Sequence, residues 1–300
     1  MASVGLIKKL TLMGLPIYSH SAYRGMAMAV SDLRSAGIAE ILRNNTESFV
    51  DLGDVELSQI TTDTGPKNLR NLPQFLKDTD SIEHVAHQVN TEDFVFCLGG
   101  GCELIVGTLA GFKGAFKGIP GVVWMDAHGD FNTPETSASG YIGGMSLAMA
   151  CGRGPRLSQR IEAVRPLLTE ESIVHVASRA LDPAEHAAMT ASPMKLYSAK
   201  SVHSEGITKV ASETANYLAD RCDWIVCHLD VDAIDPEFVP AVNFPEHGGL
   251  NLEEVTTIVE ALQKTGKVRV FNIAAYNPIF DKNDKSRNTL LKLLTELFSS

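Results

Sequence analysis

The chain has 300 residues and a formal net charge of −10, with 26 lysines and arginines against 36 acidic residues. A chain of this length can bury a sizeable core in one α/β domain. Its acidic balance, without an extended cluster of basic residues, argues against nucleic acid or an anionic membrane surface as the main partner. It does not exclude a cationic small molecule.

Three features bear on cellular location. No apolar run reaches the roughly 20 residues that span a bilayer, so no membrane partner is expected. Residues 1–10 also lack the apolar core of a secretory signal. The five cysteines are odd in number and sparsely placed. We therefore expect a cytoplasmic protein with reduced thiols.

Apolar runs typical of buried strands alternate along the chain with segments of helical length. The runs expected to form strands are residues 10–16, 94–98, 122–125, 173–177, 224–229 and 268–273. The segments expected to form helices are residues 22–36, 103–112, 213–219, 252–263 and 290–298. This alternation predicts one α/β domain over residues 1–300, with a mostly parallel sheet covered by helices on both faces. The more polar residues 44–80 are expected to form an irregular excursion.

Potential metal ligands follow one of the predicted strands. The run at residues 122–125 leads directly into Asp126, His128 and Asp130. Residues two apart in a strand project to the same face, so these three side chains can point one way. Taken alone the motif is also compatible with an ordinary junction between a strand and a loop.

A second carboxylate-rich junction follows the strand predicted at residues 224–229, where Asp230 and Asp232 occur. Ligands of parallel sheets gather at the carboxyl ends of strands, so both junctions are expected to share one site. Four carboxylates and one imidazole suit a hard or borderline divalent ion such as Mn²⁺ better than a structural zinc ion. A two-metal cluster would also neutralise carboxylates that are costly to bury unpaired.

Three segments carry a resemblance to a known superfamily. They are Asp126-Ala127-His128-Gly129-Asp130, the stretch from residue 131 to residue 140, and Leu229-Asp230-Val231-Asp232-Ala233-Ile234-Asp235-Pro236. Together they resemble the ureohydrolases, which include arginase, agmatinase and formimidoylglutamase. The resemblance covers residues 98–278 in family order, and residues 131–140 are especially similar to arginases. It implies an arginase-like fold and hydrolysis of a guanidino or formimino C–N bond at a dinuclear manganese centre.

The resemblance also implies roles for individual residues. Asp126 and Asp230 would bridge two metals, His128 and Asp232 would complete the second site, and Asp130 and Cys102 would complete the first. The family usually has histidine where this chain has Cys102, in the stretch Gly99-Gly100-Gly101-Cys102-Glu103. A thiolate is a soft ligand and a poor match for Mn²⁺, so we expect a weakened first site. Alternatively, Cys102 is a small buried hydrophobic residue.

Two further positions depart from the family pattern. Gly143 stands where arginases have a histidine that is assigned a proton-shuttle role, and loss of such a group typically costs about 10²–10⁴-fold in rate. Ala275 stands where the family has a glutamate that pairs with the guanidinium, so a charge-assisted partner is missing. Glu103 or Glu246 could compensate, although each can equally be a solvated or structural acid.

Four positions match residues that hold the amino-acid part of an arginase substrate. Asn132 and Ser139 match the residues that bind the carboxylate, and Asp182 and Glu185 match the stretch that binds the α-amino group. They favour an α-amino-acid ligand over agmatine. The alternative is ordinary turn and helix-capping chemistry.

The leading hypothesis is a manganese-dependent hydrolase of an arginine-like amino acid, with Asp130 and His128 in the catalytic set. Asp130 would orient or deprotonate the attacking water. Cysteine and glycine at two usual histidine positions resemble the branch that hydrolyses Nω-hydroxyarginine, whose guanidine is less basic. The second hypothesis is a pseudoenzyme that binds an amino acid without turnover.

Other features receive simpler interpretations. The resemblance implies a homo-oligomer, a trimer or a hexamer, and the helix predicted at residues 290–298 could serve an interface. His228 is interpreted as a packed strand residue, and the remaining cysteines as inert thiols.

Overall fold

The structure is a computed structural model that describes residues 7–298. One eight-stranded sheet forms its centre, and every pairing between neighbouring strands is parallel. The strands are β1 (Ile7–Leu15), β2 (Thr46–Asp54), β3 (Phe94–Gly99), β4 (Pro120–Met125), β5 (Ile173–Ser178), β6 (Lys195–Ser198), β7 (Trp224–Asp230) and β8 (Val268–Ala274). Their order across the sheet is β2-β1-β3-β8-β7-β4-β5-β6.

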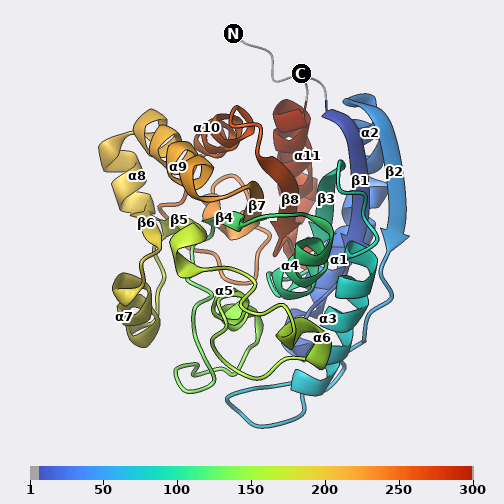
Figure 1. The fold of residues 1–300 in the computed structure, drawn as a ribbon, viewed down its shortest axis with the longest axis vertical. Helices are drawn as coiled ribbons and strands as arrows, with labels where there is room; N and C mark the ends of the chain where they lie inside the picture. The colour runs from blue at the N-terminus through green and yellow to red at the C-terminus, as the bar shows by residue number, and fades with distance from the viewer. Residues whose placement is uncertain (1–6, 299–300) are drawn as a thin grey trace.

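Helices cover both faces of this sheet (Figure 1). The α-helices are α1 (Met28–Ser35), α2 (Ile38–Asn44), α3 (Leu72–Ala86), α4 (Leu104–Ala115), α5 (Ser146–Ala150), α6 (Gln159–Glu162), α7 (Pro183–Ala191), α8 (Ala199–Glu205), α9 (Ile207–Arg221), α10 (Leu252–Gln263) and α11 (Lys285–Phe298). Short 3₁₀ helices include Ser21–Ala27, Gly143–Met145 and Val231–Ala233. The predicted three-layer α/β/α fold is confirmed.

The period of two along each strand divides the core into two layers. In β3, Phe94, Phe96 and Leu98 belong to one hydrophobic cluster, whereas Val95 and Cys97 belong to the other. Helices α9, α10 and α11 pack into the first cluster, and α3, α4 and α5 pack into the second. Because both faces are buried, the central strands consist almost entirely of apolar residues, which made them recognisable in the sequence.

The predicted elements agree with the structure in the centre of the sheet and differ at its edges. All six predicted strands are present, and the helix predicted at residues 252–263 has the bounds of α10. The helix predicted at residues 22–36 is divided into a 3₁₀ turn and α1. The irregular excursion predicted at residues 44–80 is found only at residues 55–71, because β2 lies before it and α3 begins after it. Strand β6 was also not predicted.

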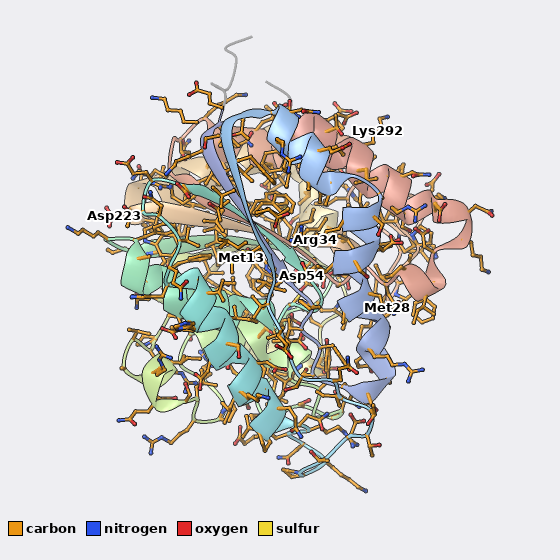
Figure 2. The ribbon with its side chains drawn as sticks, turned by 90° about the vertical axis from the view of Figure 1, so that its right-hand side faces the viewer. Met13, Met28, Arg34, Asp54, Asp223 and Lys292 are labelled. Carbon is orange, nitrogen blue, oxygen red and sulfur yellow. The ribbon has the colours of Figure 1, made fainter. Side chains whose placement is uncertain are left out.

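Strand β2 escaped prediction because it is an edge strand with a largely exposed, polar sequence. Its pairing with β1 is reinforced from α1, where Arg34 contacts two carboxylates of β2. The guanidinium lies 2.6 Å from Asp51 Oδ2 and 2.6 Å from Asp54 Oδ1. Figure 2 shows Arg34 and Asp54 beside each other at this edge. An edge strand with mostly exposed side chains has little apolar periodicity to reveal it.

Helix α11 does not offer a free apolar face. Its buried residues Leu290, Leu293, Leu294, Leu297 and Phe298 belong to the core of the same chain. These five buried side chains are therefore not available for the interface that was predicted for residues 290–298.

The predicted free thiols are confirmed, since all five cysteines are free. Four of them are buried, namely Cys97, Cys102, Cys222 and Cys227. Among residues 7–298, no helix combines the length and the apolar character needed to cross a membrane.

Candidate metal centre and active site

The candidate site lies at the carboxyl ends of the four central strands, β3, β8, β7 and β4. Asp126 directly follows β4, Asp230 is the last residue of β7, and Cys102 follows β3. The turn after β3 is fastened to the end of β8, where Ala275 N–H donates to Gly100 O at 2.6 Å. Residues distant in the sequence therefore meet because parallel strands deliver their ends to one edge of the sheet.

The strand alternation that was expected to align the ligands was wrong in detail. Strand β4 ends at Met125, so Asp126, His128 and Asp130 lie in a loop. The backbone of Asp130 has a φ of 47°, in the left-handed region. After β7 the chain turns into the 3₁₀ helix Val231–Ala233. The side chains are brought together by these turns and not by the pleat of a strand.

The two strand ends turn in the same way. The Asp126 carboxylate accepts a hydrogen bond from the backbone N–H of His128 at 2.6 Å. The Asp230 carboxylate likewise accepts from the backbone N–H of Asp232 at 2.7 Å. An aspartate that bonds the backbone two residues later stabilises a tight turn. Each aspartate thus shapes the loop that presents the next ligand-type residue.

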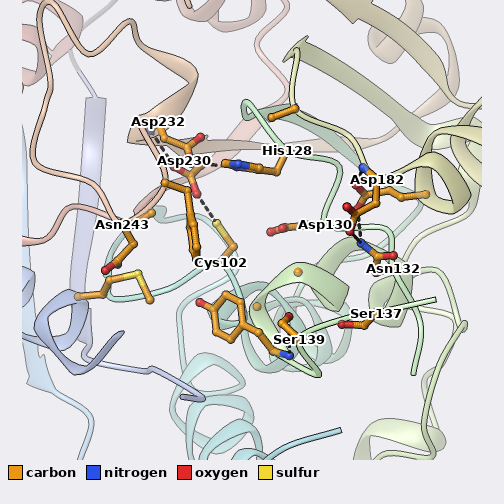
Figure 3. Close-up of a pocket in the computed structure, with 18 residues that line it drawn as sticks. Cys102, His128, Asp130, Asn132, Ser137, Ser139, Asp182, Asp230, Asp232 and Asn243 are labelled. Carbon is orange, nitrogen blue, oxygen red and sulfur yellow. Dashed lines mark hydrogen bonds and ion pairs between the residues drawn. The ribbon is translucent and has the colours of Figure 1, made fainter. Parts of the chain in front are cut away.

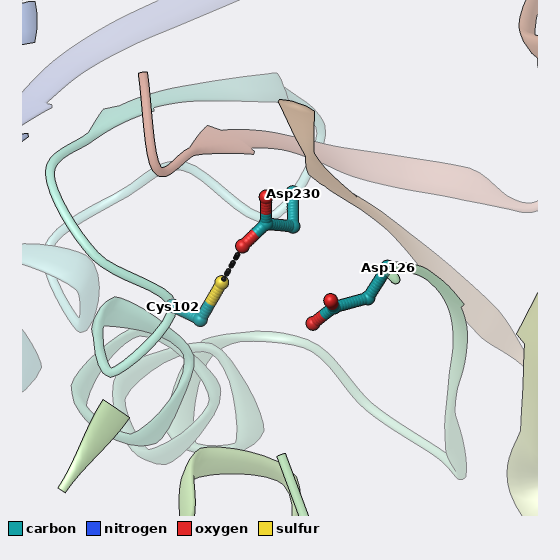
Figure 4. A group of neighbouring side chains, drawn as sticks. All are labelled: Cys102, Asp126 and Asp230. Carbon is teal, nitrogen blue, oxygen red and sulfur yellow. Dashed lines mark hydrogen bonds between the residues drawn. The ribbon is translucent and has the colours of Figure 1, made fainter. Parts of the chain in front are cut away.

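Two groups of ligand-type atoms result, and Asp126 belongs to both. One group contains Asp126, His128 and Asp232, and the other contains Cys102, Asp126 and Asp230. Within each group the ligand atoms lie within 4.8 Å of one another. Figure 4 shows the second group, in which the Cys102 thiol points at the Asp230 carboxylate with Asp126 opposite.

The group around His128 contains its own positive charge. His128 Nδ1 lies 3.0 Å from Asp232 Oδ2 and 3.5 Å from Asp126 Oδ1. Burial lowers the pKa of His128, but the bonds to both carboxylates outweigh it and hold that pKa well above its usual value. Burial raises the pKa of Asp232, yet its contact with His128 leaves that pKa below the usual range. The imidazolium therefore balances the buried carboxylates.

The group around Cys102 has no such cation among its members. Cys102 Sγ donates a hydrogen bond to Asp230 Oδ2 at 3.0 Å. Burial and the neighbouring carboxylates, Asp230 first among them, raise the pKa of the Cys102 thiol well above its usual value. Burial and the charges of Asp232 and Asp126 also raise the pKa of Asp230. This side of the centre is a protonated thiol against buried acids.

His228 supports the Cys102 group from within the sheet. Its Nε2 atom lies 3.3 Å from Cys102 Sγ, and its ring stacks on Trp124 with centroids 3.8 Å apart. Trp124 Nε1 in turn donates to Asp126 Oδ2 at 2.9 Å. Burial lowers the pKa of His228 to about 3, so the imidazole is neutral. His228 is the packed strand residue that was expected, and it additionally contacts Cys102.

The donor set fits divalent cations. Asp126, Asp230 and Asp232 are buried carboxylates, and burial of several like charges together is costly unless cations or donors compensate them. Oxygen and imidazole ligands in the His128 group suit Mn²⁺, whereas the Cys102 thiolate is softer. Because Asp126 is common to both groups, one carboxylate is positioned to contact two ions.

A cavity of about 300 Å³ opens beside these groups (Figure 3). The residues lining it are Met26, Cys102, His128, Asp130, Asn132, Ser137, Ser139, Tyr141, Gly143, Gly144, Ala180, Asp182, Glu185, Asp230, Asp232, Asn243, Phe244 and Ala275. Asp126 lies behind this surface and is fully buried. Asp130 lines the cavity but belongs to neither close group, and burial together with Asp126 and Asp230 raises its pKa well above the usual value.

The four residues expected to bind the amino-acid part line this same cavity. Asn132 Nδ2 lies 3.2 Å from Asp182 Oδ2 and 3.2 Å from Glu185 Oε1. Asp182 and Glu185 also form the capping box of α7, so the alternative of helix capping holds for them as well. Figure 3 shows Asn132 and Asp182 on the opposite side of the cavity from Asn243, with Ser139 below.

The sequence interpretation missed several cavity residues, among them Met26, Tyr141, Asn243 and Phe244. Tyr141 directly follows the recognised Ser139-Gly140 pair, so its neighbourhood was a usable signal. Asn243 and Phe244 lie in a loop without a distinctive pattern, and only the fold brings them to the site.

The two acids considered as compensation for Ala275 have different positions. Glu103 is fully buried, and its Oε2 atom accepts a hydrogen bond from the Tyr141 hydroxyl at 3.4 Å. Burial raises the pKa of Glu103, although the hydrogen bond from Tyr141 opposes the shift. Glu246 does not line the cavity, and its backbone oxygen accepts from Arg179. Glu103 is therefore the acid connected to the cavity.

Comparison with known proteins gives a consistent result over the whole length. The model of the arginase family matches residues 8–299. The arginase of Bacillus subtilis is 34% identical over 293 residues, which is 97% of either chain. The solved arginase from Bacillus caldovelox superposes with a TM-score of 0.89 at 32% identity, over 98% of this chain and 99% of that one. The Entamoeba histolytica arginase crystallised with L-ornithine gives 0.88 at 28% identity, with the same coverage.

Proposed function

The chain belongs to the arginase family of amidinohydrolases, hydrolases of non-peptide C–N bonds, and we propose that it is a manganese-dependent member acting on the guanidino group of an arginine-like amino acid. The products are urea, or a urea analogue, and an amine. The observation that carries the proposal is Asp126, which belongs to two groups of ligand-type atoms beside one cavity.

The residues that would hold the metals are the predicted set. Asp126 would be shared between both ions. His128 and Asp232 would serve one ion, and Cys102, Asp230 and Asp130 would serve the other. When bound, such ions supply Lewis acidity and lower the pKa of water towards neutrality.

The protein's own groups provide orientation and proton transfer. Asp130 lines the cavity next to both groups, and it is proposed to orient the attacking water and to accept its proton. His128, held by Asp126 and Asp232, is fixed in orientation at the same edge. Such positioning converts an encounter into an intramolecular step, which is a large contribution to catalysis.

The far end of the cavity is proposed to bind the amino-acid part of the substrate. Asn132 and Ser139 would receive the α-carboxylate, and Asp182 and Glu185 would attract the α-amino group. Asp182 is the more accessible of the two acids, because Glu185 is buried and already accepts from the Phe131 N–H at 2.9 Å. We therefore assign direct contact with the amino group to Asp182 and support of that end to Glu185.

Nω-hydroxyarginine is the proposed substrate within this class. Gly143 offers no side chain for proton transfer, and Ala275 offers no carboxylate to a guanidinium. A hydroxylated guanidine is less basic than guanidine and requires less assistance from an acid. Turnover of plain L-arginine comparable to that of the best analogue would contradict this preference.

The first experiment is elemental analysis after dialysis against excess Mn²⁺, together with a panel of guanidino compounds. Two equivalents per chain and release of urea or a urea analogue support the proposal. The product release should disappear in Asp126→Asn and persist in Asp220→Asn, which changes an exposed aspartate of α9. Absence of both metal and turnover would contradict the proposal.

A second candidate is a family member that binds the amino acid but has lost turnover through impaired metal binding. The observation that favours it is the Cys102 thiol, which burial and nearby acids keep protonated. In that case the wild type binds at most one equivalent of Mn²⁺ and releases no product from any guanidino compound, while amino-acid binding persists.

Assembly and location complete the proposal. A homo-oligomer, a trimer or a hexamer, is proposed and is checked by sedimentation velocity. A cytoplasmic location is proposed from the free thiols and is checked by fractionation of the source cells.

A further inference from the structure

The cavity offers few free acceptors to a guanidino group, which presents only N–H donors when charged. Among the cavity-lining acids, Asp230 and Asp232 belong to the ligand groups, and Asp182 and Glu185 bond Asn132. The fifth acid, Asp130, is assigned above to the metals and the attacking water. The wall between these two ends therefore determines how the guanidino group is recognised.

Most polar atoms of that wall already have hydrogen-bond partners. Ser137 Oγ accepts from the Gly140 N–H at 3.0 Å, and Ser139 Oγ accepts from the Tyr141 N–H at 3.2 Å. Asn243 Oδ1 accepts from Asn277 Nδ2 at 3.1 Å. The other wall residues are the apolar Met26, Ala180, Phe244 and Ala275 and two glycines, Gly143 and Gly144. The remaining side-chain oxygen of the wall is the hydroxyl of Tyr141.

Tyr141 occupies the space that a side chain at position 143 would take. A Cβ atom at Gly143 would lie 2.2 Å from Tyr141 Cζ and 2.3 Å from its hydroxyl oxygen. The ring also packs on the cluster that contains Met26 and Ala275, and it makes an edge contact with Tyr23 at 4.8 Å between centroids. Gly143 and Ala275 are therefore two sides of the space that this one phenol fills.

Glu103 holds the phenol from behind. The Tyr141 hydroxyl donates to Glu103 Oε2, which leaves the lone pairs of the phenol oxygen for donors in the cavity. Glu103 itself depends on a glycine, because a Cβ at Gly101 would lie 2.2 Å from its Oε2 atom. Two glycines thus make room for two polar side chains that meet beside Cys102.

We propose that Tyr141, oriented by Glu103, is a specificity-determining residue whose phenol oxygen accepts a hydrogen bond from the guanidino N–H of the substrate. This inference rests on the proposed function and deepens it, since it identifies what recognises the reacting group. Glu103 acts through Tyr141 and is a positioning residue. Its carboxyl group adds attraction for a cation, and the aromatic ring of Tyr141 adds a face that favours one.

The test compares a charged ligand with a neutral one of nearly the same shape. Isothermal titration calorimetry on the full chain, stripped of metal with a chelator, measures the affinities for L-arginine and L-citrulline. Tyr141→Phe is expected to lower the affinity for L-arginine about tenfold, the usual effect of one lost charge-assisted hydrogen bond. Glu103→Gln is expected to lower the affinity for L-arginine more than the affinity for L-citrulline, because only the arginine side chain carries a charge.

Steady-state kinetics of the manganese-loaded enzyme give a second readout. A contact that is equally strong in the ground state and in the transition state affects KM and leaves kcat nearly unchanged. Tyr141→Phe should therefore raise KM for the guanidino substrate about tenfold. A purely structural role for Tyr141 would instead lower the melting temperature and the active fraction without changing the preference between arginine and citrulline.

The position of the ring is tested independently by adding a methyl group next to it. Gly143→Ala is expected to lower the melting temperature by several degrees. Combining it with Tyr141→Ala should relieve that loss, whereas combining it with Tyr141→Phe should not. Gly144→Ala is the matched control, because no described atom lies within 4 Å of a Cβ at that position. Equal tolerance of Gly143→Ala and Gly144→Ala would overturn the proposed packing.

The outcomes separate this inference from the function on which it rests. If the wild type hydrolyses a guanidino compound but Tyr141→Phe and Glu103→Gln both leave arginine affinity within twofold, the inference alone fails. If the wild type neither binds nor hydrolyses any guanidino compound, both fail.

Discussion

The two ligand groups that share Asp126 differ in how their charges are balanced. In the group around His128, an imidazolium lies 3.0 Å from Asp232 and its contacts keep its pKa raised. In the group around Cys102, a protonated thiol donates to Asp230 at 3.0 Å, and the pKa of that acid is raised as well. One group already contains a cation between its carboxylates, and the other consists of neutralised acids.

This difference bears on how tightly each group would bind a metal ion. Ligands must lose their protons when a metal binds, and the pKa values of both His128 and the Cys102 thiol are raised, so protonation opposes metal binding in both groups. The groups differ in the sulfur of Cys102, which is softer than the donors that Mn²⁺ prefers. We therefore expect the His128 group to bind Mn²⁺ more tightly than the Cys102 group, although both use Asp126.

The largest expected effect comes from the shared residue. Asp126→Asn removes a carboxylate from both groups. It should therefore abolish most of the Mn²⁺ binding of both groups, and with it the difference between their affinities. We expect a loss of about 10³-fold in kcat, which corresponds to several kcal/mol of charge stabilisation. Turnover assays and metal analysis check this. Retention of one tight Mn²⁺ equivalent would show that the groups are independent of Asp126.

A change in one group alone separates them. His128→Asn should weaken the tighter Mn²⁺ equivalent about 100-fold, because it removes a ligand whose orientation two carboxylates fix. Cys102→Ser should leave that equivalent nearly unchanged. Calorimetric titration with Mn²⁺ measures both. A larger effect of Cys102→Ser than of His128→Asn on the tighter Mn²⁺ equivalent would mean that the Cys102 group binds more tightly.

Restoring the usual ligand type should reduce the difference between the groups. Cys102→His should tighten the weaker Mn²⁺ equivalent about tenfold, since imidazole matches Mn²⁺ better than a thiolate does. The wild type should in contrast show a cobalt–thiolate absorption band on titration with Co²⁺, and Cys102→Ser should lose it. Cys227→Ala is the control, because this buried thiol packs in the opposite core layer. A band that survives Cys102→Ser would mean that Cys102 is not a ligand.

The smallest expected effect concerns the support of Cys102. His228→Gln removes the imidazole that lies 3.3 Å from Cys102 Sγ and stacks on Trp124. Loss of a residue that orients a ligand costs about tenfold at the lower end of the usual range, and it should fall on the weaker equivalent only. Mn²⁺ titration of the variant measures it. An equal loss in both equivalents would indicate a general disturbance of the strand.

The sequence predicted the centre of the fold better than its margins. Strands such as β4 and β7 are buried on both faces, so their apolar runs are continuous and easy to recognise. The bounds of α10 agree with the predicted segment, and in the structure a capping box between Asn251 and Glu254 marks its start. Strand β2 was missed because most of its side chains are exposed, and of its apolar residues only Phe49 packs on the core.

The candidate site follows the same division. The ligand types and their place after β4 and β7 were evident from the chain, because acids that end buried strands are unusual without a partner. The reason first given for their alignment was nevertheless wrong, since turns capped by Asp126 and Asp230 align them. Local propensity indicates that a strand ends but does not specify the direction of the next side chain.

Sequence alone thus determined the α/β architecture, the family and the ligand-type residues, because strand periodicity and short motifs are local properties. Only the tertiary structure decided what surrounds them. The contact of His228 with Cys102 joins residues 126 positions apart, and the bond between Tyr141 and Glu103 spans 38 positions. The sequence marked Gly143 as a departure from the family pattern but not what fills the space beside it. The meaning of this glycine depends on the phenol that the folded chain packs against it.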